Sequence, residues 1–212
     1  MRFTTLFFDL DDTLYPPTTG LWGEIAGRIN QYMIEKMGFP PEQVVSMREQ
    51  YFREFGTTLR GLQANHHVDM DEYLAFVHDV PLDRYLHPEA GVREAIASIP
   101  ARKFIFTNSD TKHATRVLNA VGLLGLFDGI IDVHSMAPFC KPMPQAFELA
   151  RIAAGRPEWQ ASVLLDDQAR ITRAGRQLGM YTILVGKATP GEEADAALVH
   201  LTELPELLDG RI

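Results

Sequence analysis

The sequence is poor in cysteine, since Cys140 is the only one among its 212 residues. A single cysteine excludes an internal disulfide and any cysteine-based metal site, and we therefore expect a reducing, cytoplasmic location. Uncharged apolar runs are short as well, and none approaches the length that crosses a bilayer. The apolar stretch at residues 3–8 runs directly into acids and is too short for a signal peptide.

Basic residues are outnumbered, with 20 Lys and Arg against 28 Asp and Glu and a net charge of −8. A surface of this sign is a poor match for nucleic acid. An anionic small molecule is still compatible, provided that a metal ion, a lysine or helix N-termini supply local positive charge. Hydrophobic residues make up 46% of the chain, which predicts one sizeable core with room for a small appended domain.

Buried-strand patterns alternate with helical patterns along most of the chain. The strand candidates are apolar runs of β-forming residues at 3–10, 103–109, 129–135, 162–167 and 181–186. Helical patterns follow three of them, at 110–123, 141–155 and 169–179. Strands that alternate with helices of this length form βαβ units. The sequence therefore predicts an α/β fold with a Rossmann-like parallel sheet core flanked by helices.

The interval from residue 16 to residue 87 contains no good strand pattern. Apolar residues at helical spacing recur in 21–38, 41–56 and 70–80, whereas 56–67 is predicted to be a loop. Segments rich in proline and glycine bound this interval, as expected of linkers. We therefore expect an all-helical insert, residues 16–87, that interrupts an α/β core, residues 1–15 and 88–212, just after its first strand.

Acidic residues follow two of the strand candidates. Asp9 and Asp11 come at the end of the first, and Asp166 and Asp167 at the end of a later one. A lone Asp after a strand is more often a helix N-cap. If the two strands are neighbours, however, four carboxylates meet at one edge of the sheet, where open α/β folds bind ligands. Such a cluster needs a cation, and oxygen-only ligands suit Mg²⁺.

Groups that suit a phosphate follow the other strand candidates. Thr107 and Asn108 end the second strand, and Lys141 lies just before a predicted helix. Ordinary capping would explain Thr107 alone, and a solvated surface would explain Lys141 alone. Together, a hydroxyl, an amide and an ammonium at successive strand ends favour a phosphate pocket. The seven histidines show no recognised metal-ligand spacing, and we assign them no role.

Four segments, "DLDDT", "FTNS", "CKPMPQAF" and "LLDD", resemble in order the four motifs of the haloacid dehalogenase superfamily of phosphohydrolases. The helical insert resembles the cap domain that some members carry between the first two motifs. "DLDDTLYP", "FGTTLRGL" and "CKPMPQAFELA" are most similar to the pyrimidine 5′-nucleotidase branch. The fourth motif departs from the family: Gln168 and Arg170 stand where relatives often carry Ser and Asn, and Arg170 could instead face the phosphate.

This resemblance implies a Mg²⁺-dependent phosphomonoester hydrolase. Asp9 would be the nucleophile that forms an aspartyl-phosphate, and Asp11 the general acid/base. The acid role requires neighbouring carboxylates to raise the pKa of Asp11. The remaining roles implied are metal ligation by Asp9, the backbone carbonyl of Asp11 and one or both of Asp166 and Asp167, and phosphate binding by Thr107, Asn108 and Lys141.

The resemblance favours a pyrimidine nucleoside 5′-monophosphate as substrate. Candidates for substrate contact are Tyr15, Arg60 and Gln63, although packing or solvated surface explains them equally well. Three alternatives stay open: a phosphatase for another small phosphomonoester such as a sugar phosphate, a phosphomutase, and a catalytically silent phosphate-binding regulator. Dehalogenation is disfavoured, because dehalogenases lack an acid at the place of Asp11. We expect no nucleic-acid or membrane partner, and a monomer or weak homodimer.

Overall fold

The computed structural model describes residues 2–212. Its centre is a parallel sheet, whose strands within these residues stand in the order β3–β2–β1–β4–β5–β6. The strands are β1 (Thr5–Phe8), β2 (Arg102–Phe106), β3 (Gly129–Ile131), β4 (Ser162–Asp166), β5 (Tyr181–Val185) and β6 (Ala196–Leu198). The predicted α/β class is confirmed. The short edge strand β6 was not predicted, because its residues, two alanines and a leucine, include no β-branched or aromatic side chain.

The central strand β1 pairs with β2 on one side and with β4 on the other, so that Phe8 lies opposite both Ile105 and Leu165. All four residues of β1 are buried. Helices cover both faces of the sheet, and strands in this position read as continuous apolar runs. Because all three strands are parallel, the residues that follow them meet at one edge.

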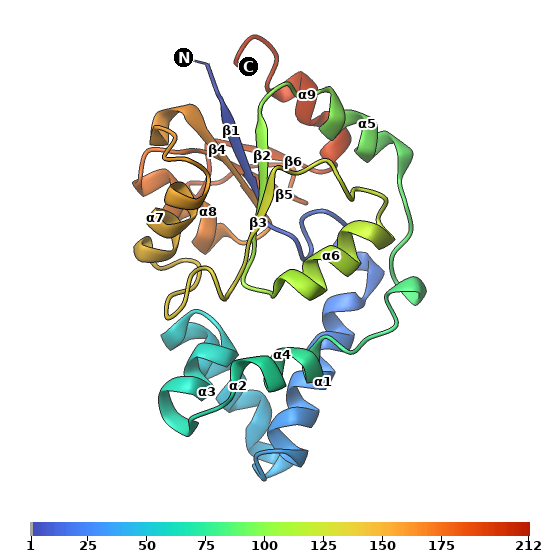
Figure 1. The fold of residues 1–212 in the computed structure, drawn as a ribbon, viewed down its shortest axis with the longest axis vertical. Coiled ribbons are helices and arrows are strands. Elements are labelled where there is room, and N and C mark those ends of the chain that lie inside the picture. Colours follow the sequence, from blue (N-terminus) through green and yellow to red (C-terminus); the bar gives the residue numbers. More distant parts are fainter. Residues whose placement is uncertain (1) are drawn as a thin grey trace.

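Helices pack on both faces of the sheet (Figure 1). Phe147 and Ile171, from the helices α7 and α8, pack with Phe7 on one face. Ile96 and Val117, from α5 and α6, pack on the other. The core helices are α5 (Ala90–Ser98), α6 (Thr111–Ala120), α7 (Pro144–Ala153), α8 (Ala169–Gln177) and α9 (Leu204–Leu207). No helix within residues 2–212 combines the length and the apolar character needed to cross a membrane.

The insert between β1 and α5 is helical and lies beyond the carboxyl ends of the strands (Figure 1). Its α-helices are α1 (Leu21–Glu35), α2 (Pro41–Phe55), α3 (Thr58–His66) and α4 (Met70–Val77). The prediction of a loop at 56–67 is wrong, because α3 occupies most of it. Thr57 caps this helix by accepting a hydrogen bond from the backbone N–H of Arg60 at 3.1 Å.

The contact between α2 and α3 depends on a glycine, Gly61. A Cβ atom at this position would lie 2.3 Å from the Cβ of Tyr51, which is far inside van der Waals contact. We therefore expect Gly61→Ala to lower the free energy of unfolding by about 1–3 kcal/mol through overpacking. Urea denaturation measures this effect. The matched control is Gly27→Ala in α1, where no atom lies within 4 Å, and which should stabilise by up to about 1 kcal/mol. Equal effects would contradict this account.

Candidate active site

Three carboxylates meet at the carboxyl ends of β1 and β4. Asp9 directly follows β1, and its backbone N–H donates to the carbonyl of Leu165 at 2.9 Å, which extends the pairing with β4 by one residue. Asp166 and Asp167 are therefore brought alongside it. One oxygen from each of the three carboxylates lies within 4.8 Å of the others. The structure thus brings together the two acidic clusters that the sequence left 157 positions apart.

Lys141 lies inside this cluster and is buried. Its Nζ is 2.7 Å from Oδ1 of Asp9 and 2.7 Å from Oδ2 of Asp166. Burial alone would lower the pKa of this lysine, but the two carboxylates outweigh it and raise the pKa, so the side chain stays an ammonium. Lys141 is therefore a buried cation that links the carboxyl ends of the two central strands, and not a solvated surface lysine.

Asn108 holds the loop that carries Lys141. Its Nδ2 donates to the carbonyl of Lys141 at 3.1 Å, and its Oδ1 accepts from the N–H of the same residue at 2.9 Å. Thr107, the other predicted phosphate ligand, accepts the N–H of Ser109 on its Oγ1 at 3.0 Å. All three predicted phosphate-binding residues therefore border one site, with Asn108 fixing the position of Lys141.

The carboxylates outnumber the single ammonium at their centre. Burial raises the pKa of Asp9 well above its usual range, and Asp166 and Asp167 add to this against the opposing charge of Lys141. Burial and the neighbouring Asp166 also raise the pKa of Asp167 to about 7. A divalent cation would relieve both shifts. Oδ2 of Asp9 and the backbone carbonyl of Asp11 accept no hydrogen bond from residues 2–212, so hard oxygen donors are available and the site fits Mg²⁺.

The raised pKa of Asp167 predicts a pH-dependent stability without metal. The folded-state value of about 7 exceeds the unfolded value of about 4, so folding favours the protonated form. The stabilising contribution is therefore present below about pH 4 and lost as the pH rises through about 7. In EDTA we expect the urea midpoint of the wild type, measured relative to that of Asp167→Asn, to decrease as the pH is raised from 5 to 8.

Comparison with Asp167→Asn is needed because His78 titrates with the opposite effect. Burial lowers the pKa of His78, so its contribution to stability increases with pH over part of the same range. Excess Mg²⁺ should abolish the fall, because the ion binds the deprotonated carboxylates. A wild type and a variant with parallel pH profiles in EDTA would contradict this prediction.

Asp11 accepts hydrogen bonds from three side chains. The hydroxyl of Tyr15 donates at 2.7 Å, Oγ of Ser109 donates at 2.7 Å, and Nε2 of His113 lies 3.0 Å from Oδ1. Burial alone raises the pKa of Asp11, but the neighbouring His113 and the hydrogen bonds from His113 and Tyr15 outweigh it and hold this pKa well below its usual range. The expectation of a raised pKa is therefore wrong, because the hydrogen-bond donors around Asp11 favour its charged form more strongly than burial disfavours it.

A pair of histidines that sequence reasoning set aside lies beside Asp11. His113 is buried and its ring stacks on that of His78, with 4.0 Å between centroids and 17° between planes. Nδ1 of His78 is 2.7 Å from Oδ2 of Asp110. His78 ends α4 of the insert, whereas His113 and Asp110 belong to the core. The position of His113 in the first turn of a helix after a motif was a usable signal, since side chains there point toward the N-terminus.

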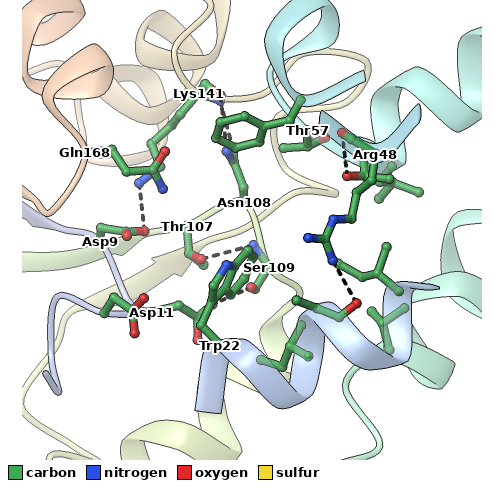
Figure 2. Close-up of a pocket in the computed structure, with 18 of the residues that line it drawn as sticks. Asp9, Asp11, Trp22, Arg48, Thr57, Thr107, Asn108, Ser109, Lys141 and Gln168 are labelled. Carbon is green, nitrogen blue, oxygen red and sulfur yellow. Dashed lines mark hydrogen bonds and ion pairs between the residues drawn. The ribbon is translucent and has the colours of Figure 1, made fainter. Parts of the chain in front are cut away.

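A cavity of about 530 Å³ opens between this edge of the sheet and the insert. Asp9, Asp11, Lys141 and other core residues line one side, as Figure 2 shows for part of them. The insert lines the other side. Arg170 borders the cavity too, but its guanidinium lies 4.0 Å from the ring centroid of Phe52 and donates to the insert backbone. It therefore joins core to insert.

The predicted substrate contacts lie elsewhere. Nη2 of Arg60 donates to the carbonyls of Val133 and Phe139 at 2.9 and 3.0 Å, and Nη1 donates to Gln63 at 2.7 Å. Neither Arg60 nor Gln63 is among the residues that line the cavity, so the structure adds no support to the expectation that they contact substrate. Arg60 instead ties α3 to a core loop. Tyr15 does not line the cavity either, and its hydroxyl donates a hydrogen bond to Asp11.

The chain matches the family model of the haloacid dehalogenase-like hydrolases over residues 3–179. It is also similar to a curated protein of Saccharomyces cerevisiae, Phosphate metabolism protein 8. The two are 30% identical over an alignment 230 positions long, which covers 96% of this chain and 72% of the yeast protein. The family match spans all four motifs, from Asp9 to the acidic pair Asp166 and Asp167.

Solved structures share the fold at lower identity. The hydrolase YfnB of Bacillus subtilis, determined bound to magnesium, superposes with a TM-score of 0.66 at 17% identity, covering 99% of this chain and 100% of that one. A phosphatase of Thermococcus onnurineus gives a TM-score of 0.62 at 20% identity, covering 99% and 100%. At these identities the likeness shows the fold alone.

Proposed function

The chain belongs to the haloacid dehalogenase-like hydrolases, and we propose that it is a Mg²⁺-dependent phosphatase for pyrimidine nucleoside 5′-monophosphates. The observation that carries the proposal is the placement of Asp9 at the cavity wall, beside buried Lys141 and two further carboxylates. A nucleophile, a cation and metal ligands then face one volume that a phosphate can enter.

In the first step an oxygen of Asp9 forms a bond to phosphorus as the bond to the leaving alcohol breaks, which gives an aspartyl-phosphate. The hydrogen bond from Lys141 to Oδ1 holds this carboxylate at the cavity wall. In the second step a water oxygen bonds to phosphorus, the bond to Asp9 breaks, and inorganic phosphate leaves. Asp11 gives a proton to the alcohol in the first step and takes one from water in the second.

The three hydrogen bonds to Asp11 favour its carboxylate form, which suits the second step. The first step requires a protonated Asp11, so at least one of these donors has to turn away when substrate binds. Thr107 and Lys141 line the cavity and would bind the phosphate oxygens, where charge spreads in the transition state. Mg²⁺, held by Asp9, the carbonyl of Asp11 and Asp166 or Asp167, would neutralise phosphate charge when bound.

The insert supports a small-molecule substrate, because it covers the cavity and leaves room for a leaving group next to Asp11. The buried, unpaired Cys140 supports a reducing, cytoplasmic location. A phosphomutase is the second candidate. It would return an isomeric phosphate ester in place of free phosphate, and a silent regulator would bind substrate with no turnover.

The test is phosphate release from UMP, CMP, AMP and glucose 6-phosphate, with Mg²⁺ and with EDTA. The proposal predicts turnover that needs Mg²⁺ and higher kcat/KM for UMP and CMP than for the other two. Equal kcat/KM values for all four esters would indicate a general phosphatase. Turnover that persists in EDTA would contradict the metal assignment. Conversion of a sugar phosphate into its isomer would favour the mutase.

A further inference from the structure

The insert side of the cavity differs in character from the catalytic side. A phosphate that reaches Asp9 leaves its alcohol on the insert side, where aliphatic residues of α1, α3 and α4 form much of the wall. Three aromatic side chains of the insert also line it, Trp22 of α1, Phe52 of α2 and Tyr73 of α4. Trp22 is unusually exposed for a large apolar residue, at 45%, whereas Tyr73 is buried and the ring of Phe52 is covered by the guanidinium of Arg170, 4.0 Å from its centroid. An exposed aromatic face at a cavity wall suits a flat ring.

One cation stands among these apolar residues. Nη1 of Arg48, in α2, donates to the carbonyl of Ala26 at 2.9 Å and to Oδ1 of Asn30 at 3.1 Å. These bonds to α1 fix the guanidinium at the cavity wall. Within residues 2–212, no carboxylate pairs with Arg48, and its Nε and Nη2 donate to no protein atom. Figure 2 shows Arg48 and Asp9 on opposite sides of the cavity.

A guanidinium with free N–H groups can donate hydrogen bonds but accept none. An acceptor oxygen of the substrate can therefore pair with it, and the oxygen of a planar carbonyl or carboxylate suits its fork of N–H groups. The adjacent Glu49 also lines the cavity, and its negative charge disfavours a second carboxylate there. A neutral carbonyl meets no such repulsion.

We infer that Arg48 and Trp22 select the leaving group: Arg48 binds a ring carbonyl of the substrate, and Trp22 contacts the face of that ring. The substrate class is then a phosphomonoester whose alcohol carries a flat, carbonyl-bearing heterocycle, as uridine and cytidine do. This inference rests on the proposed function and adds to it the residues that recognise the base.

The first test replaces Arg48 with methionine and compares UMP with phenyl phosphate, which has a ring but no carbonyl. With Mg²⁺ present, kcat/KM for UMP should fall about tenfold or more, chiefly through KM, because the contact is remote from phosphorus. The value for phenyl phosphate should stay within about twofold, since no hydrogen bond to it is lost. Arg53→Met, an exposed arginine of the same helix, is the matched control and should change neither value.

The second test is Trp22→Ala, which should lower kcat/KM about three- to tenfold for both ring substrates and leave glycerol phosphate unaffected. A loss in Arg48→Met that is equal for UMP and phenyl phosphate would overturn the inference, because it would mean a general structural role. The absence of any loss for UMP would overturn it as well.

Binding measurements separate this inference from the proposed function. In an Asp9→Asn background, calorimetric titration with UMP should show about tenfold weaker binding when Arg48→Met is added. If the wild type hydrolyses phenyl phosphate with Mg²⁺ but Arg48→Met leaves the affinity for UMP unchanged, only the inference fails. If no ester is hydrolysed but the Arg48 effect on binding persists, the proposed function fails and the base site stands.

Discussion

Asp9→Asn is expected to lower kcat at least about 10³-fold for every phosphomonoester that the protein hydrolyses. The amide that replaces the carboxylate cannot form the aspartyl-phosphate, and the remaining groups act on an intermediate that no longer arises. The fold should persist, because the change removes one of three clustered carboxylates that burial and mutual repulsion already disfavour. Phosphate release under saturating substrate, with thermal melts in parallel, measures both effects.

Asp12→Asn is the matched control for this prediction. Asp12 also borders the cavity and lies three positions from Asp9, but it is absent from the carboxylate cluster. Its backbone is left-handed, with φ of 58°, a conformation that Asn adopts as readily as Asp. Turnover in this variant should stay close to that of the wild type. If Asp9→Asn retained comparable turnover, the assignment of the nucleophile would be wrong.

Lys141→Met is expected to lower both the free energy of unfolding and the rate of phosphate release. Removal of the ammonium leaves Asp9 and Asp166 facing each other in a buried site, and breaking a buried ion pair in this way costs about 3–5 kcal/mol. The loss should be largest in EDTA and smaller with Mg²⁺, since the ion supplies part of the missing charge. Urea unfolding at neutral pH with and without Mg²⁺ measures this difference.

A second buried lysine provides the control. Nζ of Lys103, in β2, donates to the carbonyls of Ile99 and Ala101 and has no carboxylate partner among the described residues. Lys103→Met should therefore cost only about 1 kcal/mol, leave activity unchanged, and show no response to Mg²⁺. Equal losses in the two lysine variants, or a Lys141→Met deficit that Mg²⁺ does not reduce, would contradict the role given to the cluster.

Much of the fold could be predicted because its strands are buried on both faces. A strand such as β1 shows an uninterrupted apolar run. The helices of the core show apolar residues at helical spacing and N-cap residues, such as Asp110 before α6. The helix α3 escaped notice because it is short, contains Gly61, and is buried against α2 by contacts that no local pattern reports.

The candidate site was also predictable only in part. Sequence pattern placed Asp9, Asp166 and Lys141 at strand ends, because the carboxyl edge of a parallel sheet follows from where the apolar runs stop. It gave no sign of the contacts of Arg60, whose guanidinium donates to two core carbonyls in a loop more than 70 positions away.

The amino-acid sequence by itself thus determined the α/β class, the helical insert and the identity of the acids, since each depends on local periodicity or on residue type. Only the tertiary structure decided that β4 lies beside β1, that Lys141 is buried between two carboxylates, and that Arg48 faces the cavity. It also decided the state of Asp11, whose partners Tyr15, Ser109 and His113 come from separate elements. Strand order and the pKa of a buried group both depend on neighbours distant in sequence, and periodicity within one segment does not encode them.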